Sequence, residues 1–230
     1  MKPSKYHKNK SFHNWLVYRT LDRHLIKYSK YIKGILVDLG CGEKPYKEFF
    51  LKYCNKYIGV DWSNSLHNVK PDVISDLNQK INLPSEYADT AVAISVMEHL
   101  YNPQKFLNEV YRILKKDSYF ILQIPWQWWV HEAPYDYFRY TPYALKYLLE
   151  NAGFEIIEIS PQGGLFSTLA LKLNYFTLRL IKGPKFLKLL IKLFLIPMWN
   201  LSQYLAILLD KLDRHWMLEA PGYFVLARKK

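Results

Sequence analysis

A glycine turn that follows a short apolar run is the first feature of the sequence with chemical potential. Asp38 lies in this run, and Gly40, Cys41 and Gly42 form a Gly-x-Gly turn at its end. Glycine has no side chain, so backbone at such a turn can approach a ligand closely. The turn lacks the Gly-Lys-Ser/Thr of a Walker loop, and Pro45 stands where a dinucleotide fingerprint needs its third glycine. We therefore expect a ligand held without a phosphate cradle, and Cys41 as a packing residue rather than a nucleophile.

Two more acidic residues end later apolar runs. Asp61 follows the glycine turn by about twenty residues, a spacing at which a carboxylate can accept hydrogen bonds from a ribose diol. Its neighbour Trp62 could lie against adenine, and Asp76, which precedes Leu77, could accept from an exocyclic amine. Three alternatives stay open: Asp38 as a helix cap, Trp62 as core and Asp76 as a turn residue. Together the acids favour a cationic nucleoside cofactor.

The stretch from residue 125 to 141 combines aromatic and polar side chains, among them His131, Asp136 and Arg139. Histidine is the commonest general base, so we expect His131 to accept a proton. Asp136 would orient it or bind the substrate, and Arg139 would contact an anion or form an ion pair. Alternatively, Asp136 and Arg139 only brace the loop. Long aromatic loops at a catalytic face commonly form an acceptor pocket.

These residues need a framework that brings them to one edge. Short apolar runs alternate with helix-like stretches, of which residues 103–114 and 141–151 are the clearest. This alternation predicts an α/β domain with a parallel sheet and right-handed crossovers. Ligands of such sheets bind outside the carboxyl ends of the strands. The expected strands are residues 34–40, 57–62, 72–77, 90–95, 119–124, 154–159 and 222–228.

The segment from residue 35 to 154 resembles the class I S-adenosylmethionine-dependent methyltransferases of the type-11 group. Its matches, in chain order, are the glycine turn with Asp38, the acid Asp61, the pair at 76 and 77, the loop from 95 to 100 and the helix from 109 to 115. Residues 116–118 read Lys-Asp-Ser where the family usually has Pro-Gly-Gly. The resemblance implies a Rossmann-like, seven-stranded, mostly parallel sheet with its last strand antiparallel and helices on both faces.

The resemblance also implies a cofactor and its contacts. S-adenosylmethionine would have its methionine amine near Asp38, its ribose at Asp61 and its adenine near positions 76 and 77. Ser95 and Glu98, in the loop after the fourth strand, are further implied cofactor contacts. His99 beside them is a second candidate base. Glu98 and His99 could instead be a charge pair at a helix start.

The aromatic loop resembles that of type-11 methyltransferases from surface-polysaccharide gene clusters. This resemblance implies that the acceptor is a hydroxyl of a small or glycan compound, with lipid-linked glycans included. Two alternatives stay open. One is an RNA or tRNA methyltransferase, because basic chain ends are an electrostatic footprint for nucleic acid. The other is a non-catalytic S-adenosylmethionine-binding module. No RNA-binding module motif is present in the sequence, which makes nucleic acid the less favoured partner.

Charge is unevenly distributed along the 230 residues. Residues 1–33 carry a net charge of +8, residues 34–162 of −4 and residues 163–230 of +8, within a total of +12. Basic ends around a slightly acidic centre indicate contact with an anionic surface. Two cysteines exclude a disulfide framework and fit a reducing compartment. Since the first residues show no signal-peptide pattern, we expect a cytoplasmic protein.

Residues 163–213 interrupt the step to the last strand. Leucine and phenylalanine recur at helical spacing, and Gly183-Pro184 breaks the pattern among several lysines, which predicts two apolar helices joined by a basic turn. A single membrane span would prevent residues 222–228 from returning to the sheet. We therefore expect a helical pair lying peripherally on the inner face of an anionic membrane. The alternatives are a lid or a homodimer interface that contains Leu190, Phe194 and Trp199.

The chain thus divides into three parts. They are an N-terminal basic helical segment (1–33), an S-adenosylmethionine-binding methyltransferase domain (34–162 and 214–230) and a helical insertion (163–213). A helix over residues 15–26 is expected to cover the cofactor side. His7, His13 and His24 are expected at the surface, and no metal site is predicted, because no cysteine or acid completes a ligand set with them.

Overall fold

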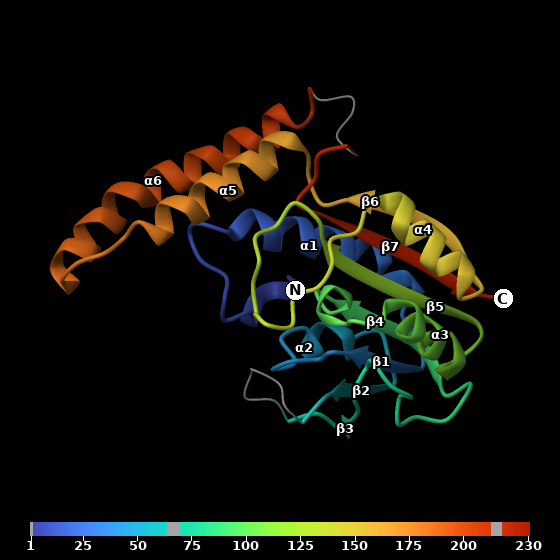
Figure 1. Cartoon of the computed structure of the whole chain (residues 1–230). Helices are drawn as coiled ribbons and strands as arrows, with labels where there is room; N and C mark the ends of the chain where they lie inside the picture. Colours follow the sequence, from blue (N-terminus) through green and yellow to red (C-terminus); the bar gives the residue numbers. More distant parts are fainter. Residues whose placement is uncertain (1, 64–69, 213–217) are drawn as a thin grey trace.

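The computed structural model describes residues 2–63, 70–212 and 218–230. A seven-stranded sheet lies at the centre with helices on both faces, and two long helices project from this body as a hairpin (Figure 1). The strand order is β3-β2-β1-β4-β5-β7-β6. The strands are β1 (Ile35–Leu39), β2 (Lys56–Asp61), β3 (Val73–Ile74), β4 (Ala88–Ile94), β5 (Leu114–Pro125), β6 (Phe154–Pro161) and β7 (Gly222–Lys229).

The strand directions confirm the predicted mixed sheet. β1 pairs in parallel with β2 and β4, and the parallel pairing continues from β2 to β3 and from β4 to β5. β7 is antiparallel to both of its neighbours, β5 and β6. Because β1, β2, β4 and β5 run the same way, their carboxyl ends share one edge of the sheet. Ligands of open α/β sheets bind at this edge.

The helices end and begin where local sequence signals place them. They are α1 (Trp15–Tyr28), α2 (Lys47–Phe50), α3 (Pro103–Ile113), α4 (Pro142–Asn151), α5 (Leu165–Arg179) and α6 (Lys185–Leu209). The Asn102 side chain caps α3 by accepting from Lys105 N, and the Thr141 hydroxyl caps α4 by accepting from Ala144 N at 3.2 Å. Proline follows each cap, where its missing N–H costs nothing.

Two hydrophobic clusters cover the two faces of the sheet, because neighbouring strand residues point to opposite sides. On β1, Val37 packs in the cluster with residues of α3 and α4, whereas Leu36 packs in the cluster with residues of α1 and α2. On β5, Phe120 belongs to the first cluster and Ile121 to the second. All four side chains are fully buried. The apolar runs are thus uninterrupted because both faces are covered.

Two strands differ in length from the prediction. β3 comprises only Val73–Ile74, so Asp76 follows the strand instead of ending it. β5 begins at Leu114 rather than at residue 119, and its pairing with β4 shifts register between Ala88 and Thr90. The family's Pro-Gly-Gly turn is therefore replaced by strand. This replacement lies at the amino end of β5, away from the ligand edge.

The hairpin of α5 and α6 confirms the predicted apolar helical pair before the last strand. Asp210, just after α6, ties the two helices together because its carboxylate accepts from Gly164 N and Phe166 N, each at 2.9 Å. Gln203 of α6 is fully buried and joins the pair to the N-terminal segment, with Leu16 N donating to its Oε1. The helix α6 is long and apolar enough to cross a membrane. The predicted domain boundary at 213/214 lies outside the described residues.

We expect Thr141→Ala to lower the free energy of unfolding by about 1 kcal/mol, the usual cost of losing a helix N-cap. The cause would be the orphaned Ala144 N–H in the first turn of α4. Urea denaturation measures the change. Thr141→Ser is the matched control because it keeps the hydroxyl, and equal stability of all three proteins would contradict the capping role.

Candidate functional site

A cavity of about 740 Å³ opens at the carboxyl ends of β1, β2, β4 and β5. Pockets for small ligands span about 300 to 1,000 Å³, so this cavity suits a nucleoside cofactor together with a small acceptor. Three further parts of the chain line it: the N-terminal segment with α1, the loop between β5 and α4, and α5. An N-terminal helix therefore covers this side, as predicted, through Val17, Tyr18 and Leu21.

The glycine turn has the backbone conformation that its residue types require. Gly40 has a φ of 70° and Gly42 a φ of 50°, in the left-handed region that favours glycine. A Cβ on Gly40 would also lie 2.4 Å from Cγ2 of Val96, whereas a Cβ on Gly42 would meet no atom of the described residues within 4 Å. The Gly42 N–H donates to Asp61 Oδ2 at 2.8 Å. This bond fixes the turn against the end of β2.

The residues predicted for ribose and adenine line the same cavity as the glycine turn. They are Asp61, Trp62, Asp76 and Leu77. Asp61 Oδ1 accepts from the Trp62 N–H at 2.8 Å, which sets the direction of its carboxylate. Asp76 Oδ1 accepts from Asn78 N at 2.9 Å, so this carboxylate shapes a turn and also reaches the cavity. A nucleoside lying across the ends of β1 and β2 would meet all four.

Asp38 is a buried acid with one strong partner. The Tyr57 hydroxyl donates to its Oδ2 at 2.5 Å. Burial raises the pKa of Asp38 to about 7, and the Tyr57 hydrogen bond only partly opposes this rise. An ammonium group in the cavity would stabilise the ionised carboxylate. Burial also raises the pKa of the Cys41 thiol, which keeps it protonated and argues against a nucleophilic role.

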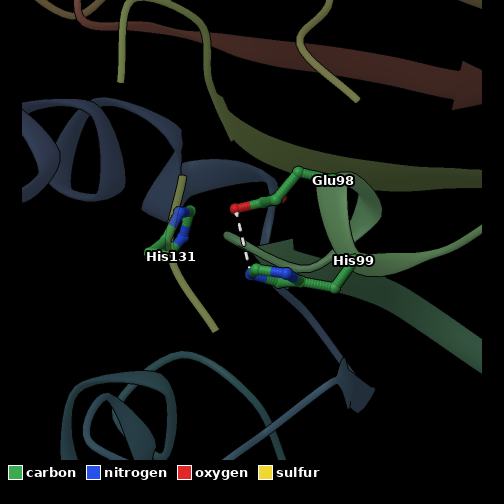
Figure 2. A group of neighbouring side chains, drawn as sticks. All are labelled: Glu98, His99 and His131. Carbon is green, nitrogen blue, oxygen red and sulfur yellow. Dashed lines mark ion pairs between the residues drawn. The ribbon is translucent and has the colours of Figure 1, made fainter. Parts of the chain in front are cut away.

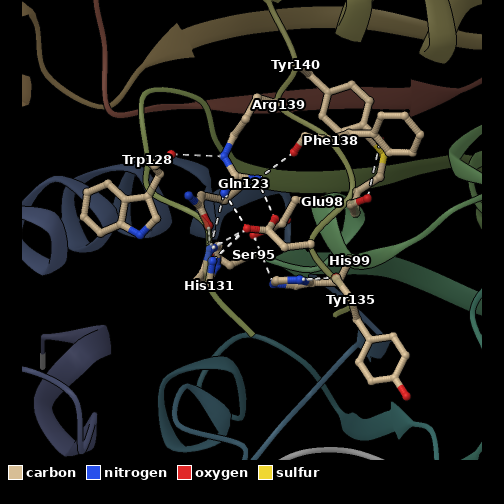
Figure 3. A network of polar contacts seen from close by, with 12 residues as sticks. Ser95, Glu98, His99, Gln123, Trp128, His131, Tyr135, Phe138, Arg139 and Tyr140 are labelled. Carbon is tan, nitrogen blue, oxygen red and sulfur yellow. Dashed lines mark hydrogen bonds and ion pairs between the residues drawn. The ribbon is translucent and has the colours of Figure 1, made fainter. Parts of the chain in front are cut away.

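His131, Asp136 and Arg139 of the β5–α4 loop form one connected unit, in which Figure 3 labels His131 and Arg139. Arg139 donates from Nη1 to Asp136 Oδ1 at 2.6 Å and from Nη2 to Oδ2 at 2.7 Å, a bidentate pair. Asp136 Oδ2 also accepts from the His131 N–H at 2.8 Å. Although burial opposes ionisation, these bonds outweigh it and lower the pKa of Asp136 to about 2. The same carboxylate therefore makes both contacts, since Asp136 Oδ2 also lies 3.3 Å from His131 Nδ1.

Glu98 and His99 lie beneath this loop (Figure 2). His99 lines the cavity, as do His131 and Ser95, whereas Glu98 is fully buried and does not line it. Glu98 Oε1 lies 3.7 Å from His99 Nε2. Burial raises the pKa of Glu98 to about 8. Burial lowers the pKa of His99, which keeps its ring neutral near pH 7.

Residues 37–122 match a family model described as a methyltransferase domain, of type 11. A probable S-adenosylmethionine-dependent methyltransferase of Mycolicibacterium smegmatis is 24% identical, over 53% of this chain and 52% of that protein. Residues 37–122 form a methyltransferase domain of the type-11 family. Its cofactor is S-adenosylmethionine. The chain spans about half the length of the curated relative it matches.

Solved structures share the fold of this methyltransferase domain. An S-adenosylmethionine-dependent methyltransferase from Archaeoglobus fulgidus superposes with a TM-score of 0.57 at 21% identity, covering 92% of this chain and 94% of that one. The [4+2]-cyclase SpnF superposes with a TM-score of 0.59 at 15% identity, covering 97% and 85%. The fold therefore accommodates more than one reaction. The acceptor has to be argued from the site itself.

Aromatic rings line the same cavity as the residues predicted to bind the cofactor. Trp128 and Trp129 stack with ring centroids 4.1 Å apart, and Tyr175 of α5 lies 3.8 Å from the Trp129 ring. Trp128, Trp129 and Tyr175 all line the cavity. The helical insertion therefore contributes to the methyltransferase site and is not separate from it. Flat rings of this kind present a large apolar surface to a bound molecule.

Two glutamines at the carboxyl edge of the sheet are absent from the predicted site. Gln123 of β5 lines the cavity and is buried, with the Ser95 hydroxyl donating to its Oε1 at 2.8 Å. Its Nε2 donates to Gln162 Oε1 at 2.6 Å, and Gln162 also lines the cavity. A signal was present in the sequence, because Gln123 interrupts an otherwise apolar strand. A buried polar side chain in such a strand needs partners and so points to a site.

The prediction that three N-terminal histidines lie at the surface is wrong. All three are partly buried and lie against aromatic rings. His7 lines the cavity beside Tyr18, His13 contacts Tyr175, and His24 stacks on Phe224. The reason is tertiary packing, because α1 and the segment before it contact both the sheet and the hairpin.

We expect Asp61→Ala to weaken S-adenosylmethionine binding by more than tenfold, about 1.4 kcal/mol or more. The substitution removes the carboxylate expected to hold the ribose and the acceptor for the Gly42 N–H. Isothermal titration calorimetry measures the affinity. Asp117→Ala, at the opposite end of the sheet, is the control and should bind as the wild type does. No binding by the wild type would contradict the assignment of the cavity.

Proposed function

We propose that this domain transfers the methyl group of S-adenosylmethionine to a hydroxyl of a small or glycan acceptor, lipid-linked glycans included. The position of His131 carries the proposal. Its imidazole lines the same cavity as Asp38, Gly40 and Asp61, and the Asp136 carboxylate lies against its Nδ1. A proton acceptor and the cofactor residues therefore share one enclosed space.

Methyl transfer to a hydroxyl requires that the two reactants are correctly oriented and that one group accepts the hydroxyl proton. The acceptor oxygen attacks the methyl carbon while the carbon–sulfur bond breaks, and the electron pair stays on sulfur, which leaves S-adenosylhomocysteine. Correct orientation of two reactants can contribute about 7–11 kcal/mol. A hydroxyl must also lose its proton during attack, and a positioned histidine is the commonest group to accept one. The cluster around His131 would serve this purpose.

The α5–α6 hairpin supports a membrane-associated acceptor. It exposes large apolar side chains over most of its length, including Phe186 and Phe194, each 71% exposed. Lys182, Lys185, Lys188 and Lys192 are exposed around the same end. Apolar side chains with neighbouring lysines suit the headgroup region of an anionic membrane. We propose that this hairpin attaches the enzyme peripherally to the cytoplasmic face.

The geometry of α5 connects this surface to the cavity. Leu171 and Tyr175 of α5 line the cavity, whereas Leu173 and Phe176 of the same helix are exposed. One helix therefore has a face toward the cavity and a face toward the proposed membrane. A lipid-linked acceptor could reach the aromatic wall without leaving the membrane surface.

A homodimer through the hairpin is the competing proposal for these apolar side chains. Leu190 and Phe194 are exposed and remain available for it. Trp199 is not, because it is 4% exposed and its Nε1 donates to Thr177 Oγ1 within the hairpin. Trp199 is therefore not available for the expected dimer interface.

RNA or tRNA methylation is the second candidate function, favoured by the net charge of +12. Against it, the exposed lysines of the hairpin lie among leucines and phenylalanines. Bases of single-stranded RNA are usually held by stacking aromatics, so this surface suits lipid better. Salt-sensitive tRNA binding at sub-micromolar affinity would reverse the preference.

We expect His131→Ala to lower turnover at least a hundredfold and to leave S-adenosylmethionine affinity within twofold of the wild type, because proton transfer contributes about 10²–10⁴-fold. Formation of S-adenosylhomocysteine with a polysaccharide-precursor extract measures turnover, and calorimetry measures affinity. His24→Ala is the control, since His24 does not line the cavity. Unchanged turnover in His131→Ala would remove this residue from the mechanism, and no turnover by the wild type would favour a binding module.

We expect the protein to float with anionic liposomes at low salt and to be released as salt rises. Each lysine near such a surface contributes about 1 kcal/mol, so replacing Lys182, Lys185, Lys188 and Lys192 by Gln should abolish flotation. Replacing four other exposed lysines, Lys52, Lys56, Lys116 and Lys146, is the matched control and should have little effect. No flotation of the wild type would favour the dimer, whereas resistance to high salt and carbonate would favour a span by α6.

A further inference from the structure

Three side chains with metal-binding donor atoms meet where the β5–α4 loop folds over residues 97–99. They are Glu98, His99 and His131, whose donor atoms all lie within 4.8 Å of one another (Figure 2). The loop is held there by its backbone, since Tyr137 N donates to the Glu98 carbonyl at 2.9 Å. Residues 33 positions apart are thus brought together by the tertiary structure.

Glu98 is the unexplained member of this cluster. Its side chain is fully buried, and among the described residues neither carboxylate oxygen has a hydrogen-bond partner. Burying a carboxylate without such partners is costly. A buried acid of this kind indicates a missing partner, and that partner should be a cation because both oxygens are free to accept it.

His99 presents its second ring nitrogen to this carboxylate, and a ring nitrogen of His131 lies within 4.8 Å of the other two donor atoms. His99 Nδ1 lies 2.8 Å from the Tyr135 carbonyl, which leaves Nε2 on the side of Glu98, 3.7 Å from Oε1. His131 Nδ1 lies 3.2 Å from the Trp129 carbonyl and 3.3 Å from Asp136 Oδ2. Two acceptors at Nδ1 favour the proton there, although Arg139 Nη2 also approaches it at 3.4 Å. Metal-ligating histidines are oriented in this way by a carbonyl or carboxylate.

We infer that Glu98, His99 and His131 bind one divalent transition metal ion with the preferences of Zn²⁺. Two imidazoles and one carboxylate are a known catalytic set for such ions, with further positions left open. Both histidines line the cavity, so the open side would face the acceptor. Glu132 also lines the cavity beside His131, and the charge of Arg139 is compensated by Asp136. Local charge therefore does not oppose a cation.

The inference rests on the proposed function and refines the part that His131 plays in it. An ion at this place would lower the pKa of an acceptor hydroxyl as a Lewis acid. His131 would then act as a ligand, and Asp136 would position it from the far side of the ring. Without an ion, Glu98 would stay a buried acid whose carboxylate oxygens lack a hydrogen-bond partner among the described residues. The two states differ in whether a metal ion is bound, so measuring the metal content distinguishes them without measuring activity.

Titration of the chelator-treated full chain with Zn²⁺, followed by calorimetry and elemental analysis, tests the inference. We expect one equivalent to bind and Glu98→Gln, His99→Gln and His131→Gln each to weaken binding by more than tenfold, since even an outer partner of a metal ligand is worth about 10–100-fold. Co²⁺ in the same site should give visible d–d absorption that each variant loses. His24→Gln and Glu150→Gln are matched controls and should bind as the wild type does.

Two outcomes would overturn the inference: less than one equivalent in the wild type, or equal affinity in the wild type and all three site variants. Circular dichroism and S-adenosylmethionine binding show whether each variant is folded. Failure of the proposed methyl transfer can be distinguished from failure of the metal site. Stoichiometric Zn²⁺ binding without any methyl transfer would support the metal site and contradict the activity. Chelator-resistant turnover with no metal binding would overturn the metal site and leave the activity intact.

Discussion

The alignment of four parallel strands at one edge is the constraint on which the whole site depends. Because β2, β1, β4 and β5 are paired in parallel, the residues that follow them meet at that edge. Each strand end contributes a polar group to the cavity: Asp38, Asp61, Ser95 and Gln123. Both faces of the sheet are covered by helices, so this edge is where polar groups can gather without entering the apolar core.

The β5–α4 loop organises another part of the cavity. The bidentate pair of Arg139 with Asp136 also anchors the Trp129 carbonyl, to which Arg139 Nη2 donates at 2.9 Å. The same loop then delivers His131 and an aromatic wall to the cavity. The pKa of Asp136 is lowered to about 2, so its carboxylate stays ionised in this pair. The stability it contributes is present above its unfolded pKa of about 3.9 and is lost only as pH falls toward 2.

The helical insertion contributes to the wall of the cavity and packs against the N-terminal segment. Beyond the sheet and the helices that cover it, α5 adds Tyr175 to the cavity wall. Asn174 of the same helix is buried and donates to the His13 carbonyl, which joins the insertion to the N-terminal segment. The two basic ends of the chain therefore pack together beside the site. This arrangement places charge, apolar surface and acceptor wall within one structural unit.

The sequence by itself determined the helices and strands and the part of the site predicted to bind the cofactor. Apolar runs, the caps Asn102 and Thr141 and the glycine turn are local signals, and parallel strands then carry Asp38 and Asp61 to a common edge. Only the tertiary structure decided that Glu98 is buried against His99 and beneath His131, and that aromatic rings of the loop stack on α5. These contacts join residues far apart in the chain. Local periodicity carries no information about them, because packing between distant segments depends on the complete fold.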